Sequence, residues 1–183
     1  MSEKRKQVLN VAEQLFYDYG FHGVGLKQIV KEANVATMTL YNHFSSKNTL
    51  VEETIKHREE RYWAYIRSTS ESYSNEPFVR IAQLHGAFLK EVSPQGCMFL
   101  RAIEVYQDTD SNIVYIAKNH KSKVLQYFEE LAIHNNIKDY KNFAYEFLLI
   151  IEGATSMTQI TDSTQATEHA VTMTKALQSH FQT

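Results

Sequence analysis

Helical periodicity runs along almost the whole chain, and this pattern limits the possible folds more than any other feature of the sequence. Apolar residues recur every three or four positions, and only two prolines and six glycines interrupt them over 183 residues. A half-buried strand would instead alternate apolar and polar residues between turn signals, and no such stretch is visible. The sequence therefore predicts an all-α fold.

The expected helices number about nine. The first should run from about Glu3 to Tyr19 and end before Gly20, because glycine commonly follows the C-cap of a helix. Pro94, Gln95 and Gly96 predict a turn in the second half. The other helices are expected at about 26–33 and 37–44, from 47 past 63, and at 77–92, 97–107, 110–135, 138–161 and 163–180.

Residues 26–44, which read LKQIVKEANVATMTLYNHF, predict a helix-turn-helix. Two helices too short to be stable in isolation are joined by a tight turn and flanked by longer helices. In this arrangement the second short helix enters the DNA major groove. One face would lock the two helices at a fixed angle through Ile29, Val30, Ala33, Val35, Leu40 and Phe44.

The opposite face carries short polar and adaptable side chains, which suit contact with base edges and thymine methyl groups. These are Thr37, Met38, Thr39, Asn42 and His43. The Tyr41 hydroxyl can reach a phosphate, and Lys47 lies where a helix N-terminus already favours an anion. A generic helical pair with solvated polar faces is the alternative interpretation of the same residues.

The charge distribution agrees weakly with a DNA-binding N-terminal part. The whole chain carries a formal net charge of −2, which by itself argues mildly against a polyanionic partner. Residues 1–50, however, carry six lysines and arginines against four acidic residues, whereas the remainder carries 13 against 17. A weakly basic first part would face the nucleic acid.

Residues 8–52 resemble the DNA-binding domain of the TetR/AcrR family of bacterial regulators. The first helix and its exit match in VLNVAEQLFYDYGFHG, and the most specific segment is TLYNHFSSKNTL, from Thr39 to Leu50. The motifs cover about the first quarter of the chain. The resemblance implies a helix-turn-helix domain of three helices at residues 1–47 and a helical ligand-binding and dimerisation domain at 48–183.

The resemblance also implies a set of DNA contacts. Lys27 would contact a phosphate or a base edge, Thr37, Met38 and Thr39 would approach bases, and Tyr41, His43 and Lys47 would bind phosphates. Three positions depart from the family. Val24-Gly25 replaces a capping Thr or Ser, Ala36 replaces a common Ser, and Met38 replaces a frequent Gly. A missing side-chain cap costs about 1 kcal/mol, and these departures make the operator sequence unpredictable.

The last two helices predict a dimer interface. Apolar residues cover more than one face of the penultimate helix, which indicates burial against both its own domain and a partner. Small Gly153 and Ala154 would permit close helix approach, so we expect a two-fold interface of four helices. A monomer in which this helix is merely central is the alternative. The interface residues expected are Phe147, Ile151, Ala154, Met173 and Leu177.

The middle helices hold many aromatic and ionisable residues, and such an inventory can line a small-molecule pocket. The candidates are Trp63, His85, Phe88, Phe99, Arg101, Glu104, His120 and Tyr127. Each residue has an ordinary structural alternative. Arg101 and Glu104 are three positions apart on one helix and can pair with each other, and the histidines can be satisfied or exposed.

Enzymatic function is not expected, because no nucleophile motif and no paired metal-ligand spacing occur in the sequence. No metal or cofactor is expected either. The single Cys97 and the lack of an apolar leader predict a cytoplasmic protein without membrane contact. We therefore expect a homodimeric repressor that binds a palindromic DNA operator and is released by a small-molecule inducer. A helical protein-interaction module and an activator without small-molecule control are the alternatives.

Overall fold

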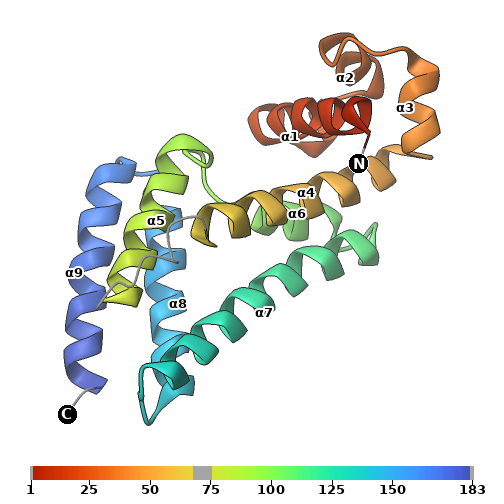
Figure 1. The fold of residues 1–183 in the computed structure, drawn as a ribbon. Helices are drawn as coiled ribbons and strands as arrows, with labels where there is room; N and C mark the ends of the chain where they lie inside the picture. The colour runs from red at the N-terminus through yellow and green to blue at the C-terminus, as the bar shows by residue number, and fades with distance from the viewer. Residues whose placement is uncertain (1, 68–75, 182–183) are drawn as a thin grey trace. The chain divides into compact units, whose positions relative to one another are not determined.

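The structure, a computed structural model, describes residues 2–67 and 76–181. The described residues form nine helices and no strand, which confirms the all-α prediction (Figure 1). The helices are α1 (Glu3–Gly23), α2 (Leu26–Glu32), α3 (Thr37–His43), α4 (Lys47–Arg67), α5 (Pro77–Glu91), α6 (Met98–Tyr106), α7 (Ser111–His134), α8 (Tyr140–Met157) and α9 (Ser163–Phe181).

The chain divides into two compact units. The first unit contains residues up to 61 together with 98–118, and the second contains 62–97 and 119–183. Two helices, α4 and α7, each contribute residues to both units. This division assigns α6 and the start of α7 to the unit of the short helices, whereas the sequence placed a single boundary after residue 47.

In the first unit, α1 packs on α2, α3 and α6. Its buried stripe consists mainly of apolar residues, including Val8, Ala12 and Phe16. Gly20 leaves the helical conformation with φ 77° and ψ 159°, so the regular part of α1 ends there and one more turn follows. Glycine adopts a positive φ without the steric penalty of a Cβ atom. The break in the helical conformation thus falls at the glycine where the sequence predicts the helix to end.

In the second unit, α9 packs against both α5 and α8 (Figure 1). Phenylalanines fill the core. The ring centroids of Phe78 in α5 and Phe143 in α8 are 4.6 Å apart, and those of Phe128 in α7 and Phe147 in α8 are 4.7 Å apart. Gly86 permits the close contact of α5 with α9, since a Cβ atom there would lie 2.1 Å from the Thr167 hydroxyl oxygen.

No described helix combines the length and apolar character needed to cross a membrane. The described residues also include no group of three or more His, Cys, Asp or Glu side chains placed to hold a metal ion.

Candidate nucleic-acid interface

The α2–α3 pair forms a rigid unit whose apolar side chains face inward. Ile29, Ala33, Leu40 and Phe44 have no exposed surface. The turn between the helices is closed by the Val35 amide, which donates to the Val30 carbonyl at 3.2 Å. Asn34 adopts φ 47° in this turn, a conformation that asparagine tolerates better than most residues. Both helices also contact α1, so α3 is held at a fixed angle.

The opposite face of α3 presents the predicted base-reading side chains. Met38 is 70% exposed and Tyr41 is 49% exposed. Thr37 and Asn42 are also exposed, whereas Thr39 and His43 are half-buried at the edges of this face. Leu40, between them in sequence, is buried, so one short helix separates a structural face from a solvent-facing one.

Two lysines flank this face in sequence. Lys27 is exposed on the first turn of α2, and Lys47 is half-buried at the start of α4. Burial lowers the pKa of Lys47 below its usual value. The first turn of α4 is capped by a side chain, because the Thr49 amide donates to the Ser46 hydroxyl oxygen at 3.0 Å.

Helices α2 and α3 have no side-chain cap at their N-termini, as the sequence predicts. Gly25 at the N-cap of α2 and Ala36 at the N-cap of α3 make no side-chain hydrogen bond to the helix. Ala36 nevertheless has φ −70° and ψ 147°, the extended conformation of an ordinary N-cap residue. The backbone at position 36 therefore has the conformation that a capping side chain needs, but alanine has no group that could accept the hydrogen bond.

A buried charge network links α1 to α4, and the sequence interpretation missed it. The Glu13 Oε1 atom accepts hydrogen bonds from Arg58 and Arg61, each at 2.7 Å. The side chain of His57 bonds that of Asn10 at 2.8 Å. Glu13 is nearly fully buried. A carboxylate within the apolar stripe of the first helix was the available signal, since an acidic residue is rarely buried unless it is paired.

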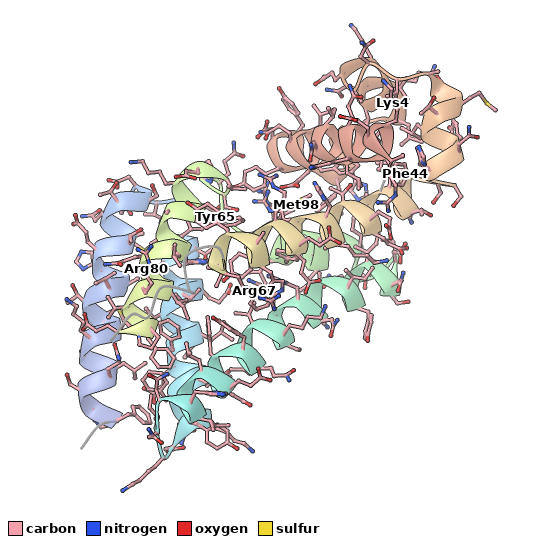
Figure 2. The ribbon with its side chains drawn as sticks, in the orientation of Figure 1. Lys4, Phe44, Tyr65, Arg67, Arg80 and Met98 are labelled. Carbon is pink, nitrogen blue, oxygen red and sulfur yellow. The ribbon has the colours of Figure 1, made fainter. Side chains whose placement is uncertain are left out.

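The N-terminus of α1 is tied to the same region. Arg5 pairs with Glu53 of α4, and its guanidinium lies 5.4 Å from the Phe44 ring centroid. Lys4, one residue earlier, is exposed (Figure 2). The Ser2 hydroxyl oxygen caps α1 and lies 3.4 Å from the His43 Nε2 atom at the end of α3. The start of α1 therefore borders the end of the proposed reading helix.

Five of the predicted pocket residues belong to the second unit, where Tyr62 links most of them. The Tyr62 ring is 5.3 Å from Phe88, 5.3 Å from His120 and 6.1 Å from His85, measured between centroids. The Trp63 ring contacts His120 at 6.3 Å and Tyr127 at 5.4 Å. The structure thus brings these five residues into one aromatic cluster.

His85 is buried in this cluster, and its hydrogen bonds define its protonation. The Thr155 hydroxyl donates to the Ile151 carbonyl at 3.0 Å, so it accepts from the His85 Nε2 atom at 2.8 Å. Burial, with the charge of Lys121 adding to it, lowers the pKa of His85 to about 3. His85 is therefore a neutral donor at physiological pH.

The other three predicted pocket residues belong to the first unit, so they are not in the same compact unit as this cluster. They are Phe99, Arg101 and Glu104. Phe99 is buried and Glu104 is exposed. Arg101 donates from Nη1 to the Tyr17 carbonyl oxygen at 2.9 Å, which is a contact to α1 that the sequence did not indicate.

Most of the residues predicted for the dimer interface lie inside the core of their own chain. Phe147 and Ile151 are almost completely buried there, and Ala154 and Leu177 are also buried. These side chains pack within their own chain, because α8 contacts both α5 and α9. Only Met173, 55% exposed, presents its side chain to solvent.

The exposed apolar face of the two last helices consists of different residues. Leu149 of α8 is 59% exposed, Met157 is exposed at the end of α8, and Ile160 is exposed in the turn that follows. A groove of about 340 Å³ runs between α8 and α9, with Leu149, Gly153 and Met173 in its lining.

Comparison with known proteins gives an N-terminal match. Residues 8–54 match the family described as bacterial regulatory proteins, tetR family. The transcriptional regulator UidR of Escherichia coli (strain K12) is 37% identical over 67 residues, which cover 37% of this chain and 34% of UidR. The transcriptional activator FasR of Mycolicibacterium smegmatis is 44% identical over 45 residues, which cover 25% of this chain and 20% of FasR. The chain thus matches about a third or less of the length of these relatives.

Similarity of fold extends over the whole chain. A TetR-family transcriptional regulator from Streptomyces coelicolor superposes with a TM-score of 0.89 at 23% sequence identity, covering 99% of this chain and 97% of that one. At this identity the likeness establishes the fold. The relatives are transcriptional regulators and not enzymes, in agreement with the sequence interpretation.

Proposed function

We propose that the chain belongs to the TetR family of bacterial regulatory proteins, and that it acts in the cytoplasm as a repressor that binds a palindromic operator as a homodimer. The exposed face of α3 carries this proposal. Thr37, Met38, Tyr41 and Asn42 project from a helix whose Leu40 is fully buried, so the reading side chains stand on a fixed support. Short polar side chains and a methionine suit base edges and thymine methyl groups in the major groove.

Dimerisation is proposed through the exposed apolar face of α8 and α9. Leu149 and Met173 lie in the lining of the groove between these helices, and solvent-exposed large apolar side chains gathered in one patch favour a protein partner. A second copy related by a two-fold axis would cover the same residues on both chains. The dimer would place two α3 helices about 34–36 Å apart, one turn of DNA.

Release by a small molecule completes the proposal. The aromatic cluster of Trp63, His85, Phe88, His120 and Tyr127 is our candidate for the ligand site in the second unit. Helix α4 begins at Lys47, which follows the proposed DNA-reading helix α3 in sequence, and it supplies Trp63 to the cluster. This one helix therefore connects the proposed DNA contacts to the proposed ligand site along the chain. A coupling of about 1–3 kcal/mol per site would give several-fold to hundredfold release.

Repression is proposed because an occupied operator excludes other proteins from the same DNA. FasR is named as an activator, which keeps activation as the alternative. The direction is tested by measuring transcription from a promoter that carries the operator, with and without the protein.

Operator binding is tested by selecting random duplex DNA with the purified chain and sequencing the bound pool. An enriched palindrome is the expected result and supplies the operator for inducer screening. Weak phosphate contacts are strongest at low salt. A pool without enrichment under those conditions would contradict sequence-specific binding and favour a helical protein-interaction module.

A further inference from the structure

Arg101 of α6 holds an unusual position at the end of the regular part of α1. Its Nη1 atom donates to the Tyr17 carbonyl oxygen at 2.9 Å, and its guanidinium carbon lies 4.5 Å from the Tyr17 ring centroid. Gly20 breaks the helical conformation three residues later. The last carbonyl groups before it therefore lack donors within the helix and accept hydrogen bonds from outside α1. A cation at a helix C-terminus is also favoured by the helix dipole.

The other side of this guanidinium has no partner among the described residues. The Arg101 Nε and Nη2 atoms are both buried and make no hydrogen bond. Their two N–H bonds point in the same direction, side by side. This is the pair with which arginine binds both oxygens of a carboxylate, and leaving buried donors of a cation unmet is unfavourable.

A second arginine on the same ring shows what the Arg101 pair lacks. The Arg58 guanidinium lies 4.7 Å from the Tyr17 ring centroid, and its Nη1 atom donates to the Glu13 carboxylate at 2.7 Å. Both guanidinium groups therefore stack on Tyr17, but only the one from α4 has a carboxylate partner among the described contacts. The first unit supplies an anion for Arg58 and none for Arg101.

We infer that the Nε and Nη2 atoms of Arg101 bind the carboxylate of a small molecule with an apolar body. The apolar body suits the surroundings, because α1 and α6 meet through aromatic side chains. The Phe21 ring centroid lies 5.6 Å from that of Phe16 and 5.6 Å from that of Tyr106. An aromatic acid therefore matches the charge of the guanidinium and the aromatic side chains of this region, of which the Tyr17 ring stacks on Arg101 itself.

Binding there would act on the contact between α6 and α1, and α1 packs on both α2 and α3. A carboxylate at Arg101 would therefore change the affinity for DNA. This regulatory consequence rests on the proposed function, whereas carboxylate binding itself does not.

The test compares benzoate with neutral benzamide on the full chain, at ionic strength matched with sodium chloride. Benzoate at about five times its dissociation constant should raise the Tm by about 2–4 °C, and benzamide should not. Arg101→Lys keeps the charge but loses the paired donors, so it should lose the shift. Arg80→Lys, on α5 in the second unit, is the matched control and should retain it.

A second measurement on the unaltered protein keeps the inference testable if Arg101→Lys does not fold. In an NMR spectrum of arginine Nε–H groups, benzoate should move the Arg101 signal. No movement, or equal Tm shifts with benzamide, would overturn the inference. The same conclusion would follow if Arg101→Lys responded to benzoate as the unaltered chain does.

The two proposals fail separately. Benzoate binding without any enriched operator would contradict the regulator and leave the Arg101 site standing. An enriched operator without benzoate binding would do the opposite. If both hold, benzoate should lower the affinity for the selected operator several-fold, as followed by fluorescence anisotropy.

Discussion

At the scale of single residues, α3 carries buried positions and exposed positions within seven residues, and the exposed ones are the proposed DNA contacts. Leu40 is fully buried, whereas Met38 and Tyr41 on either side of it are exposed. Substitution of an exposed side chain therefore leaves the packing of the helix intact. Changes in DNA binding at these two positions report on DNA contact and not on the fold.

Tyr41 and Met38 should respond differently to truncation. Tyr41→Ala should weaken binding to the selected operator and to random DNA alike, because a phosphate contact carries no sequence information. Met38→Ala should instead change the preference among related sites. Both are measured by titrating labelled duplexes. A loss confined to one sequence for Tyr41→Ala, or an unchanged site preference for Met38→Ala, would contradict these roles.

Ala36 offers a stabilising substitution. Its backbone already has the conformation of an N-cap, and its methyl group makes no hydrogen bond to α3. Ala36→Ser should raise the free energy of unfolding by about 1 kcal/mol, since serine can accept a bond from an amide of the first turn. Urea denaturation measures the change. Ala36→Val serves as the control, because valine cannot cap, and an equal gain from both would refute the explanation.

At the scale of helices, Gly20 decides where the regular part of α1 ends. Its φ of 77° is unfavourable for any residue with a Cβ atom, although no atom lies within 4 Å of the position that such a Cβ would take. Gly20→Ala should therefore cost roughly 1–3 kcal/mol of unfolding free energy through the backbone, because ψ is 159° and this region is accessible essentially only to glycine. Gly23→Ala, also with open space around it, is the control and should cost less in the same denaturation experiment.

The contact between α5 and α8 should make stability depend on pH through His85. Its pKa is about 3 in the folded chain and about 6.5 when unfolded, so the unfolded chain takes up the proton first. The contribution is complete above pH 6.5 and is lost as the pH falls below it. From pH 6.5 to 5 the loss should be on the order of 1–2 kcal/mol.

His85→Gln tests this assignment, because glutamine can still donate to Thr155 but does not titrate. The variant should show a smaller fall in unfolding free energy between pH 6.5 and 5. Burial also lowers the pKa of His57, so part of the dependence will remain. An unchanged slope in His85→Gln would show that His85 does not contribute.

The positions of the helices were largely predictable from the sequence. Which face of each helix packs against which neighbour was not. Gly20 and the turn at 94–96 are local signals, and the helix ends they predict agree with the structure within a few residues. Phe147 and Ile151 were assigned to a partner because a pattern with several apolar faces does not say which face meets the neighbouring helix. The exposed residues of α3 could be grouped from the sequence because they share one short helix, whereas the contact of Arg101 with Tyr17 joins residues 84 positions apart.

For the whole molecule, self-association is the property that one substitution tests most directly. Leu149→Glu would place an unpaired carboxylate on each copy in an apolar interface, so self-association should weaken on the order of 100-fold. Size-exclusion chromatography with light scattering measures the mass. Ile133→Glu changes an exposed aliphatic residue of α7 and should leave the dimer intact. A dimer that survives Leu149→Glu would place the interface elsewhere.

The division of α3 into a buried and an exposed face has an evolutionary consequence. Exposed residues such as Thr37, Met38 and Asn42 have no part in the core, so mutation can exchange them without loss of stability. After duplication of such a gene, the two copies can come to recognise different DNA sites while both proteins remain folded at every step. New regulatory circuits would then arise by drift at the exposed positions of α3, with the rest of the chain unchanged.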